Sequence, residues 1–455
     1  MDSGLLADML ESVKDQGLNL HSLTVVRDGV IISDTYFAPY APETRHETAS
    51  ITKSITGTLV GVALQQGMIR SLDDPVATYL SQASDHPDKA DLTLRHLLTL
   101  QTGLDCDLSI TEGQMQTSPD WVGFLLDVPM EGPPGRDWYY CSPAVHLLSA
   151  VLQAATGMST REFANQYLFG PLGIDPASAS DWPDDPQEVT RGDIGLWLTP
   201  HELAKVGTLY LNEGSWQGAQ LLSADWIHQA TTTQADKGDG TGYGYLWTTY
   251  PGQSHYAALG RGGQQLHVFP DQGLVVVVAA ALPALAESEA INHLLSDYIL
   301  PAARSSTLLP ENAKALARLR ELETAFSRPP APQVLQPSIV QQISGVNYAF
   351  PDNPVGWSQL RMTFGDKAAT ATLQDGAYTI GLDGAFRITY PKAGPAIALR
   401  GAWLDNRTLE LEELMIGTAD EYRLTLTYEG TNLRVHVSES VFLSSEFEFE
   451  GEATD

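Results

Sequence analysis

The chain has 455 residues, of which 43% are hydrophobic, so it holds enough apolar material for more than one folded core. Its formal net charge of −30 repels nucleic acids and anionic membrane surfaces, which excludes both as partners. Cys106 and Cys141 lack a Cys-x-x-Cys spacing, so we expect neither a disulfide framework nor a zinc site. The first residues carry acids instead of the basic residues of a secretory signal, and we expect a cytoplasmic protein.

The elements predicted in the first part of the chain mix strands with helices. Residues 23–32 alternate as a strand, and a helix begins after Ser50. Further helices are predicted at residues 92–100, 143–156, 200–212 and 287–300. Strands return at residues 243–249 and 265–281. This order indicates a sheet whose N-terminal and C-terminal strands pair, with a helical region inserted between them.

The remainder of the chain has a different pattern. A charged, periodic helix at residues 312–327 runs into a proline-rich segment at residues 328–332, which is typical of a stiff linker. Beyond it, short alternating runs are separated by turn signals such as Asp375-Gly376. We therefore expect three parts, namely a mixed α/β domain at residues 1–305, a helical and Pro-rich linker at 306–336, and an all-β barrel or sandwich at 337–455.

The helix after Ser50 opens with Ser50-Ile51-Thr52-Lys53, a pattern that helix stability alone does not favour. An ammonium in the first turn faces the positive end of the helix dipole, and a capping box would place Glu or Gln there. Because residues three apart share a helix face, Lys53 can reach the Ser50 hydroxyl and activate it as a nucleophile. The alternative is that Ser50 only caps the helix while Lys53 points to solvent, and the motif alone leaves both open.

A serine nucleophile also needs a proton acceptor elsewhere in the chain. The turn-rich loop at residues 132–143 carries Tyr140 and Ser142 just before a predicted helix. A tyrosinate held by the Lys53 ammonium could serve as the base, although a lone half-buried tyrosine with any hydrogen-bond partner is the plainer reading. Cys141 is expected to be a small buried apolar residue and no second nucleophile.

A glycine-rich segment at residues 259–264 leads into the last predicted strand of the first domain. Gly262 and Gly263 let the backbone approach a substrate, and the amide of Gln264 is expected to join the amide of the nucleophile in binding an oxyanion. Arg261 adds positive charge at the rim. An ordinary glycine-rich turn is the alternative.

One rival for this role is Lys392-Ala393-Gly394, which also has a basic-x-Gly pattern. It is followed by Pro395, which has no N–H to donate to an oxyanion. The rival is rejected on that ground.

In this order the motifs resemble the Ser-x-x-Lys, Tyr-x-Asn/Ser and basic-x-Gly patterns of the serine β-lactamase and penicillin-binding-protein superfamily, in its class C-like, esterase and 6-aminohexanoate-dimer hydrolase branch. Residues 92–104 and 198–216 resemble further stretches of these proteins, and Leu147-Leu148 single out Tyr140 over Tyr139. The resemblance covers about residues 23–302. It implies an α+β fold with an antiparallel sheet flanked by helices plus a helical region, and no cofactor. The C-terminal part resembles lipocalin-like domains appended to some members.

Two departures from the family pattern bear on the substrate. Gly262 stands where β-lactamases and D,D-peptidases have Thr or Ser, and Ser142 stands where they have Asn. Both changes favour esters or small amides over β-lactams, while Arg261 leaves a carboxylate-bearing substrate possible. The resemblance shows no counterpart of the class A deacylation glutamate, so activation of water would fall to Tyr140 with Lys53.

The sequence thus predicts a serine hydrolase that cleaves carboxylic esters or small amides through an acyl-enzyme on Ser50, with Lys53 and Tyr140 exchanging protons. A β-lactamase or D-amino-acid peptidase is the enzymatic alternative. A catalytically degenerate binding module is the non-enzymatic one, motivated by the departures at Ser142 and Arg261. The chain has no Gly-x-Ser-x-Gly elbow and no His-Glu-x-x-His, which argues against an α/β-hydrolase and a zinc protease. The oligomeric state is left open.

Overall fold

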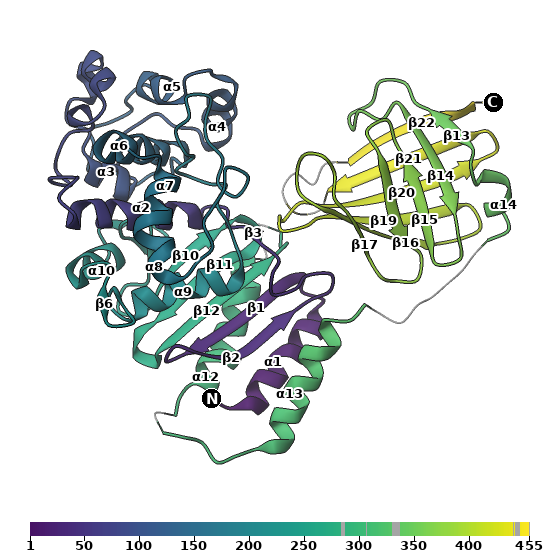
Figure 1. The fold of residues 1–455 in the computed structure, drawn as a ribbon, viewed down its shortest axis with the longest axis horizontal. Coiled ribbons are helices and arrows are strands. Elements are labelled where there is room, and N and C mark those ends of the chain that lie inside the picture. Colours follow the sequence, from purple (N-terminus) through teal and green to yellow (C-terminus); the bar gives the residue numbers. More distant parts are fainter. Residues whose placement is uncertain (284–286, 306, 330–336, 440, 442–445, 455) are drawn as a thin grey trace. The chain divides into compact units, whose positions relative to one another are not determined.

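The computed structural model describes the chain except residues 284–286, 306, 330–336, 440, 442–445 and 455, and except the side chains of residues 108–110 and 287–288. The chain forms two compact units that interleave along the sequence (Figure 1). One unit comprises residues 24–33 and 47–278, and the other comprises residues 1–23, 34–46 and 279–455. The domain boundaries expected from the sequence stay a prediction.

An eight-stranded sheet carries the first part of the fold. Its order is β2 (Val30–Tyr36), β1 (Leu20–Arg27), β12 (Leu274–Ala280), β11 (Gln264–Phe269), β10 (Tyr256–Gly260), β9 (Thr248–Thr249), β8 (Gly242–Tyr243) and β7 (Ala235–Asp236). The N-terminal strand β1 lies beside β12, as the sequence predicts. All seven residues of β12 are buried, which explains its uninterrupted apolar run. The single strand expected at residues 23–32 is wrong, because Asp28 and Gly29 both have positive φ and turn the chain into a hairpin.

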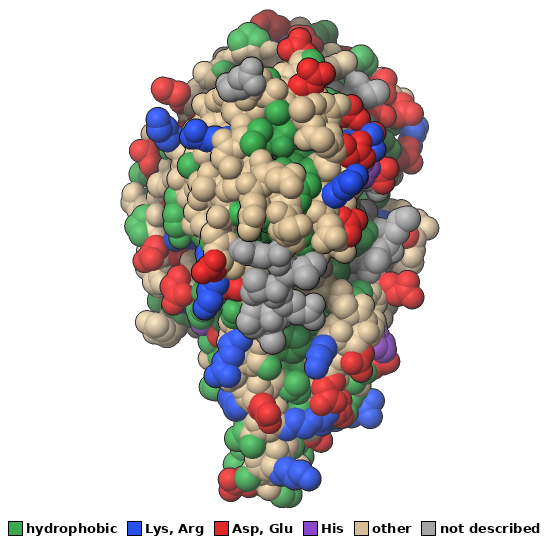
Figure 2. Space-filling view, turned by 90° about the vertical axis from the view of Figure 1, so that its right-hand side faces the viewer, with side chains coloured by type: hydrophobic (Ala, Val, Ile, Leu, Met, Phe, Trp, Pro, Cys, Tyr) green, Lys and Arg blue, Asp and Glu red, His purple; other side chains and the backbone are tan. Residues whose placement is uncertain are grey.

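Charged side chains lie mainly at the surface. On the face shown in Figure 2, acidic side chains are spread among lysines and arginines and do not gather in one patch. The helices α1 (Ser3–Gln16) and α13 (Ala313–Phe326) show how the few cations are used. Arg318 of α13 pairs with Asp8 at 2.6 Å and also bonds Glu11 of α1. Such exposed pairs each contribute little to stability.

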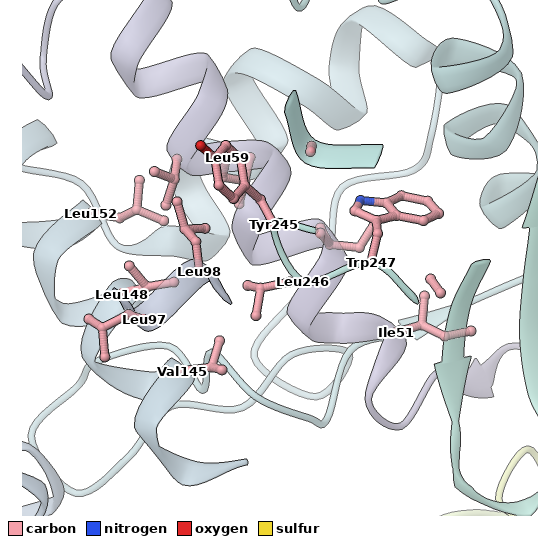
Figure 3. Packing of buried hydrophobic residues seen from close by; sticks show 14 of the residues in the cluster. Ile51, Leu59, Leu97, Leu98, Val145, Leu148, Leu152, Tyr245, Leu246 and Trp247 are labelled. Atoms are coloured by element: carbon pink, nitrogen blue, oxygen red, sulfur yellow. The ribbon is translucent and has the colours of Figure 1, made fainter. Parts of the chain in front are cut away.

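The helix that begins after Ser50, α2 (Ile51–Gln65), is buried from Ile51 to Ala63. Side chains from several elements surround it, among them Leu98, Leu148 and Trp247 (Figure 3). Gly61 allows a very close approach, since a Cβ there would lie 2.4 Å from Cε2 of Trp226. A helix enclosed in this way cannot shift easily, so it holds its first turn in a fixed position.

The other described helices of this region include the predicted ones, with small changes at their ends. They are α3 (Leu94–Thr99), α4 (Leu108–Thr117), α5 (Trp121–Asp127), α6 (His146–Thr156), α7 (Thr160–Ala164), α8 (Gly170–Leu172), α9 (Pro200–Leu211), α10 (Ala224–Thr231), α11 (Glu287–Leu294) and α12 (Leu300–Ala302). Short strand pairs join β3 (His46–Glu47) to β4 (Trp197–Leu198), and β5 (Ser215–Trp216) to β6 (Ala219–Gln220). The helix α9 begins at a capping box in which Thr199 and Glu202 bond each other's backbone N–H groups.

In its described residues the C-terminal part is all-β, as expected, apart from the short helix α14 (Val340–Ile343). Its ten strands are β13 (Asn347–Ala349), β14 (Gln359–Phe364), β15 (Ala368–Thr372), β16 (Ala377–Gly381), β17 (Arg387–Thr389), β18 (Ile397–Trp403), β19 (Thr408–Met415), β20 (Glu421–Glu429), β21 (Asn432–Glu439) and β22 (Glu446–Thr454). A parallel contact between Gly381 of β16 and Arg400 of β18 closes the sheet into a barrel. Buried and partly buried residues alternate strictly along β21, so one face of this strand lines the barrel core. The predicted hairpin turn at Asp375-Gly376 joins β15 to β16.

The cysteines overturn one expectation. Cys106 and Cys141 form a disulfide with their Cα atoms 5.6 Å apart, although no disulfide was expected from their spacing. They are 35 residues apart, and folding brings together the loop that follows α3 and the loop that precedes α6. Tertiary proximity of this kind has no signature in the spacing. Separately, none of the described helices is long and apolar enough to cross a membrane.

Candidate active site

Ser50 lies at the start of α2, where the chain turns sharply. Ala49, the residue before it, has a φ of 49°, a left-handed conformation that is strained for a residue with a side chain. Ser50 makes no side-chain capping bond to the helix backbone. The interpretation of Ser50 as a simple helix cap is therefore wrong, and its hydroxyl is available to other partners.

Those partners are the two residues that the sequence singled out. Lys53 Nζ donates to Ser50 Oγ at 2.9 Å, and the Tyr140 hydroxyl donates to the same oxygen at 2.8 Å. Lys53 is only 1% exposed, and its Nζ lies 5.4 Å from the centre of the Tyr140 ring. A buried ammonium and a phenol thus meet at one alcohol oxygen, as predicted, and the interpretation of Lys53 as a solvent-facing side chain is wrong.

The loop that carries Tyr140 is held by contacts on both sides. Cys141 is bonded to Cys106, and the backbone N–H of Tyr139 donates to the carbonyl of Leu100 at 3.1 Å. The side chain of Tyr139 is 52% exposed, whereas that of Tyr140 contacts Ser50. The Trp138 ring lies 6.3 Å from the Tyr140 ring and packs beside it. The preference for Tyr140 drawn from the paired leucines agrees with this geometry.

Asp193 is a site residue that sequence reasoning missed. Its backbone carbonyl accepts a bond from Lys53 Nζ at 2.8 Å, and its fully buried carboxylate bonds Arg191 Nε at 3.0 Å. Burial opposes ionisation of this carboxyl, but the charges of Arg191 and Lys53 outweigh burial and hold the pKa of Asp193 below its ordinary value. The signal available in the sequence was Arg191-Gly192-Asp193, a charged pair around a glycine just upstream of the segment at residues 198–216.

Ser142 is directed to this carboxylate and makes no hydrogen bond to Lys53. Its hydroxyl donates to Asp193 Oδ2 at 3.2 Å and is 3% exposed. Arg191 in turn bonds Glu112 of α4 at 2.8 Å. Ser142 and Arg191 both contact the Asp193 carboxylate, and the backbone carbonyl of Asp193 bonds Lys53. Both side chains therefore support the position of Lys53.

The glycine-rich segment lies against residues 48–49, which directly precede Ser50. A Cβ on Gly260, at the end of β10, would lie 2.7 Å from the Thr48 carbonyl oxygen, 2.9 Å from Ala49 Cβ and 3.1 Å from Gln264 Cβ. Only glycine permits so close an approach of β10 to the residues before Ser50. Gln264, the first residue of β11, is buried. The role of its backbone N–H as a donor to an oxyanion stays a prediction.

The glycines of the same segment have the backbone that a tight turn requires. Gly262 and Gly263 have φ angles of 76° and 87°, and Arg261 beside them is exposed. Burial raises the pKa of Glu47, while Arg261 and the Gly195 N–H, which donates to Glu47 Oε1 at 2.8 Å, act in the opposite direction. The rival Lys392-Ala393-Gly394 lies far away in sequence, between β17 and β18 of the barrel.

Among the residues that the structure describes, no group of three or more His, Cys, Asp or Glu side chains could hold a metal ion. At Ser50 the structure brings together an alcohol, an ammonium and a phenol.

Comparison with known proteins identifies the family. The family model described as Beta-lactamase matches residues 8–297, well over half of the chain, so the chain belongs to the Beta-lactamase family. A 6-aminohexanoate-dimer hydrolase of Paenarthrobacter ureafaciens is 23% identical over 286 residues, which cover 57% of this chain and 72% of that protein.

Two solved structures show similar folds. An octameric penicillin-binding protein homologue from Pyrococcus abyssi is 19% identical with a TM-score of 0.54, and the match covers 99% of this chain and 100% of that one. EstCE1, described as a hydrolase with promiscuous acyltransferase activity, is 17% identical with a TM-score of 0.55 and matches 67% of this chain and 99% of its own. The family and these relatives establish a serine β-lactamase fold of the hydrolase type, followed by a C-terminal barrel.

Proposed function

We propose that this protein is a serine hydrolase that cleaves carboxylic esters or small amides through a covalent acyl-enzyme on Ser50. The observation that carries the proposal is the convergence of Lys53 Nζ at 2.9 Å and the Tyr140 hydroxyl at 2.8 Å on the Ser50 oxygen. A serine that only stabilised its helix would bond the backbone of that helix, which Ser50 does not.

Acylation requires that Tyr140 first lose its hydroxyl proton to solvent, which leaves a phenolate beside the Lys53 ammonium. Ser50 Oγ then forms a bond to the acyl carbon of the substrate while its proton passes to the phenolate oxygen of Tyr140. The Tyr140–Lys53 pair then gives a proton to the departing alcohol or amine as the bond between that group and the acyl carbon breaks. In deacylation, water loses a proton to the same pair and attacks the acyl carbon, and Ser50 Oγ recovers a proton as it leaves. The buried Lys53 ammonium stabilises each state in which the phenol is ionised.

The negative charge that forms on the carbonyl oxygen needs two donors. We assign this role to the backbone N–H groups of Ser50 and Gln264, which belong to the start of α2 and to β11. Close packing of Gly260 against Thr48 and Ala49 supports the assignment, because it sets this segment next to the nucleophile loop.

The substrate preference follows from the absence of a free hydroxyl at two positions of the site. Gly262 offers no hydroxyl to a substrate carboxylate, and the Ser142 hydroxyl is engaged with Asp193. Uncharged esters therefore lead as substrates. A second candidate, a β-lactam or D-amino-acid amide, is favoured by one observation only, the exposed guanidinium of Arg261, which could pair with a substrate carboxylate.

The test combines covalent labelling with turnover. A fluorophosphonate should label the wild-type protein at Ser50, and Ser50→Ala should lose labelling and at least about 10³-fold in turnover of nitrophenyl butyrate. The matched control is Ser54→Ala, one turn further along α2, where the hydroxyl donates to the Leu246 carbonyl and not to the catalytic pair. Retention of ester turnover in Ser50→Ala would disprove the nucleophile.

Parallel assays with nitrocefin and D-alanyl amides separate the two substrate classes. Faster turnover of either than of short nitrophenyl esters would replace the ester proposal with the second candidate. If no probe labels Ser50 and no substrate is turned over, the result would favour the alternative that the protein is a catalytically degenerate binding module.

A cytoplasmic location stays a prediction, and the Cys106–Cys141 disulfide argues against it because disulfides persist mainly in oxidising compartments.

A further inference from the structure

The C-terminal barrel holds a cavity of about 180 Å³ that the hydrolase site does not use. An apolar cavity of about 150 Å³ is large enough to bind benzene, so this one can hold a molecule slightly larger. Its walls are largely apolar and come from six strands, including Leu360 of β14, Ile380 of β16, Leu399 of β18 and Leu426 of β20. A ligand of this size would be enclosed mainly by aliphatic side chains.

Two acidic residues, Asp375 and Glu413, interrupt that apolar wall, and Asp375 accepts a hydrogen bond from the Tyr378 hydroxyl. Along β19, Leu409, Leu411 and Glu413 share the parity that faces the barrel core, and Leu411 and Glu413 both line the cavity. Glu413 stands opposite Leu399 on one side and Tyr422 on the other. Since inward-facing positions of a small barrel are usually apolar, an apolar residue is expected at position 413, where this chain has a glutamate.

The outward-facing glutamates of the same strand have cationic partners, but Glu413 does not. Glu412 bonds Arg400 with Nε at 2.8 Å, and Glu410 lies 3.6 Å from Arg423. No hydrogen bond or ion pair joins Glu413 to any residue that the structure describes. Glu413 is partly buried, and a carboxylate on the wall of a largely apolar cavity loses hydration that no cationic partner replaces.

We infer that the barrel is a binding site for a small primary amine with an apolar tail of about six carbons, whose ammonium group pairs with Glu413. The tail fills the aliphatic part of the cavity, and the ammonium supplies the cation that Glu413 lacks. An alcohol of equal size gains the apolar contacts and a hydrogen bond to Glu413 but no charge pairing, and a carboxylate of equal size is repelled by Glu413 and by Asp375. The site is independent of the hydrolase reaction proposed above.

The protonation of Glu413 sets the pH at which this pairing works. Burial raises the pKa of Glu413 to about 7. The titratable groups that face it are Tyr378 of β16, Tyr422 of β20 and Asp375, which accepts a bond from the Tyr378 hydroxyl at 2.8 Å, while β18 presents Leu399. Since none of these is cationic, the carboxylate form prevails only above neutral pH, and amine binding should strengthen from pH 5.5 to pH 8.

The test is calorimetric titration of the full-length protein with hexylamine, hexanol and hexanoate at pH 8 and moderate salt. Hexylamine should bind at least about ten-fold more tightly than hexanol, and hexanoate should bind most weakly. Glu413→Gln should remove the advantage of the amine and leave hexanol binding unchanged. Glu410→Gln, on the outer face of the same strand, is the matched control and should bind like the wild type.

A second variant locates the ligand. Ala371 lines the cavity, and Ala371→Leu should fill it and weaken binding of both hexylamine and hexanol at least about five-fold. Equal binding of amine and alcohol, preference for hexanoate, an amine preference that survives Glu413→Gln, or no binding at millimolar concentrations would each overturn the inference.

Discussion

At the scale of single residues, the adjacent tyrosines Tyr139 and Tyr140 differ in their contacts. Tyr140 bonds the Ser50 oxygen at 2.8 Å, whereas Tyr139 is 52% exposed. Tyr140→Phe should lower kcat for nitrophenyl butyrate about 10²–10⁴-fold with little change in KM, because it removes the proton carrier and leaves the binding surface intact. Tyr139→Phe is the matched control and should retain kcat. Equal effects of the two substitutions would contradict the role of Tyr140.

Asp193 is a positioning residue, since it acts through Lys53, Arg191 and Ser142. Asp193→Asn should lower the free energy of unfolding by about 3 kcal/mol, because Arg191 and Lys53 would lose a buried negative charge and Arg191 would keep only Glu112. It should also lower kcat about ten-fold or more and alter the pH profile of kcat, since Lys53 loses a nearby negative charge. Asp184→Asn, which breaks a pair with Arg161 on the same segment, is the control and should leave the pH profile unchanged.

The pH dependence of stability has a definite sign here. The folded-state pKa of Asp193 is depressed, so its contribution is present above the unfolded-state pKa near 4 and is lost as pH falls through the folded-state value. The difference in unfolding free energy between the wild type and Asp193→Asn should therefore be largest near neutral pH and shrink below about pH 4. Chemical denaturation across this range measures it, and a difference that grows in acid would contradict the pairing.

At the scale of elements, the disulfide joins the loop after α3 to the loop that carries Tyr140. Replacing both Cys106 and Cys141 with alanine should lower the free energy of unfolding by about 2–4 kcal/mol, since the unfolded chain regains the freedom of a long loop. It should also lower kcat, because Tyr140 adjoins Cys141. Thermal unfolding and ester turnover with and without a phosphine reductant measure both effects. The reductant should reproduce the double substitution in the wild type and do nothing to the double variant.

At the scale of the whole molecule, a net charge of −30 produces self-repulsion in the folded state. Raising NaCl from about 0.05 M to 1 M shortens the Debye length to about 3 Å and should raise Tm by several degrees. A similar rise with sodium perchlorate below about 0.2 M would show that screening, and not a specific salt effect, is responsible. A Tm that falls with NaCl would mean that ion pairs such as Arg318–Asp8 outweigh the repulsion.

The local chemistry of the site could be predicted from the sequence. A Ser-x-x-Lys pair depends only on the spacing along one helix, and the contact between Lys53 and Ser50 follows from helix geometry. The uninterrupted apolar run at residues 273–283 indicated a buried strand, which is β12, although the single strand expected at residues 265–281 is divided into β11 and β12. Alternation of apolar and polar residues predicted the strands of the barrel, because side-chain direction repeats every two residues. The choice of Tyr140 over Tyr139 came from the family resemblance.

Contacts between distant segments were decided by the tertiary structure. The Cys106–Cys141 bond, the buried carboxylate of Asp193 behind Lys53 and the unpaired Glu413 in the barrel wall all depend on which loops and strands meet. The hairpin at Asp28-Gly29 replaced one expected strand with two, and here the local sequence did hold the signal, because Asp-Gly between alternating runs is typical of a two-residue hairpin turn. The hydrophobic period of a segment indicates which of its side chains are buried. Which other segment covers those side chains depends on how the whole chain packs.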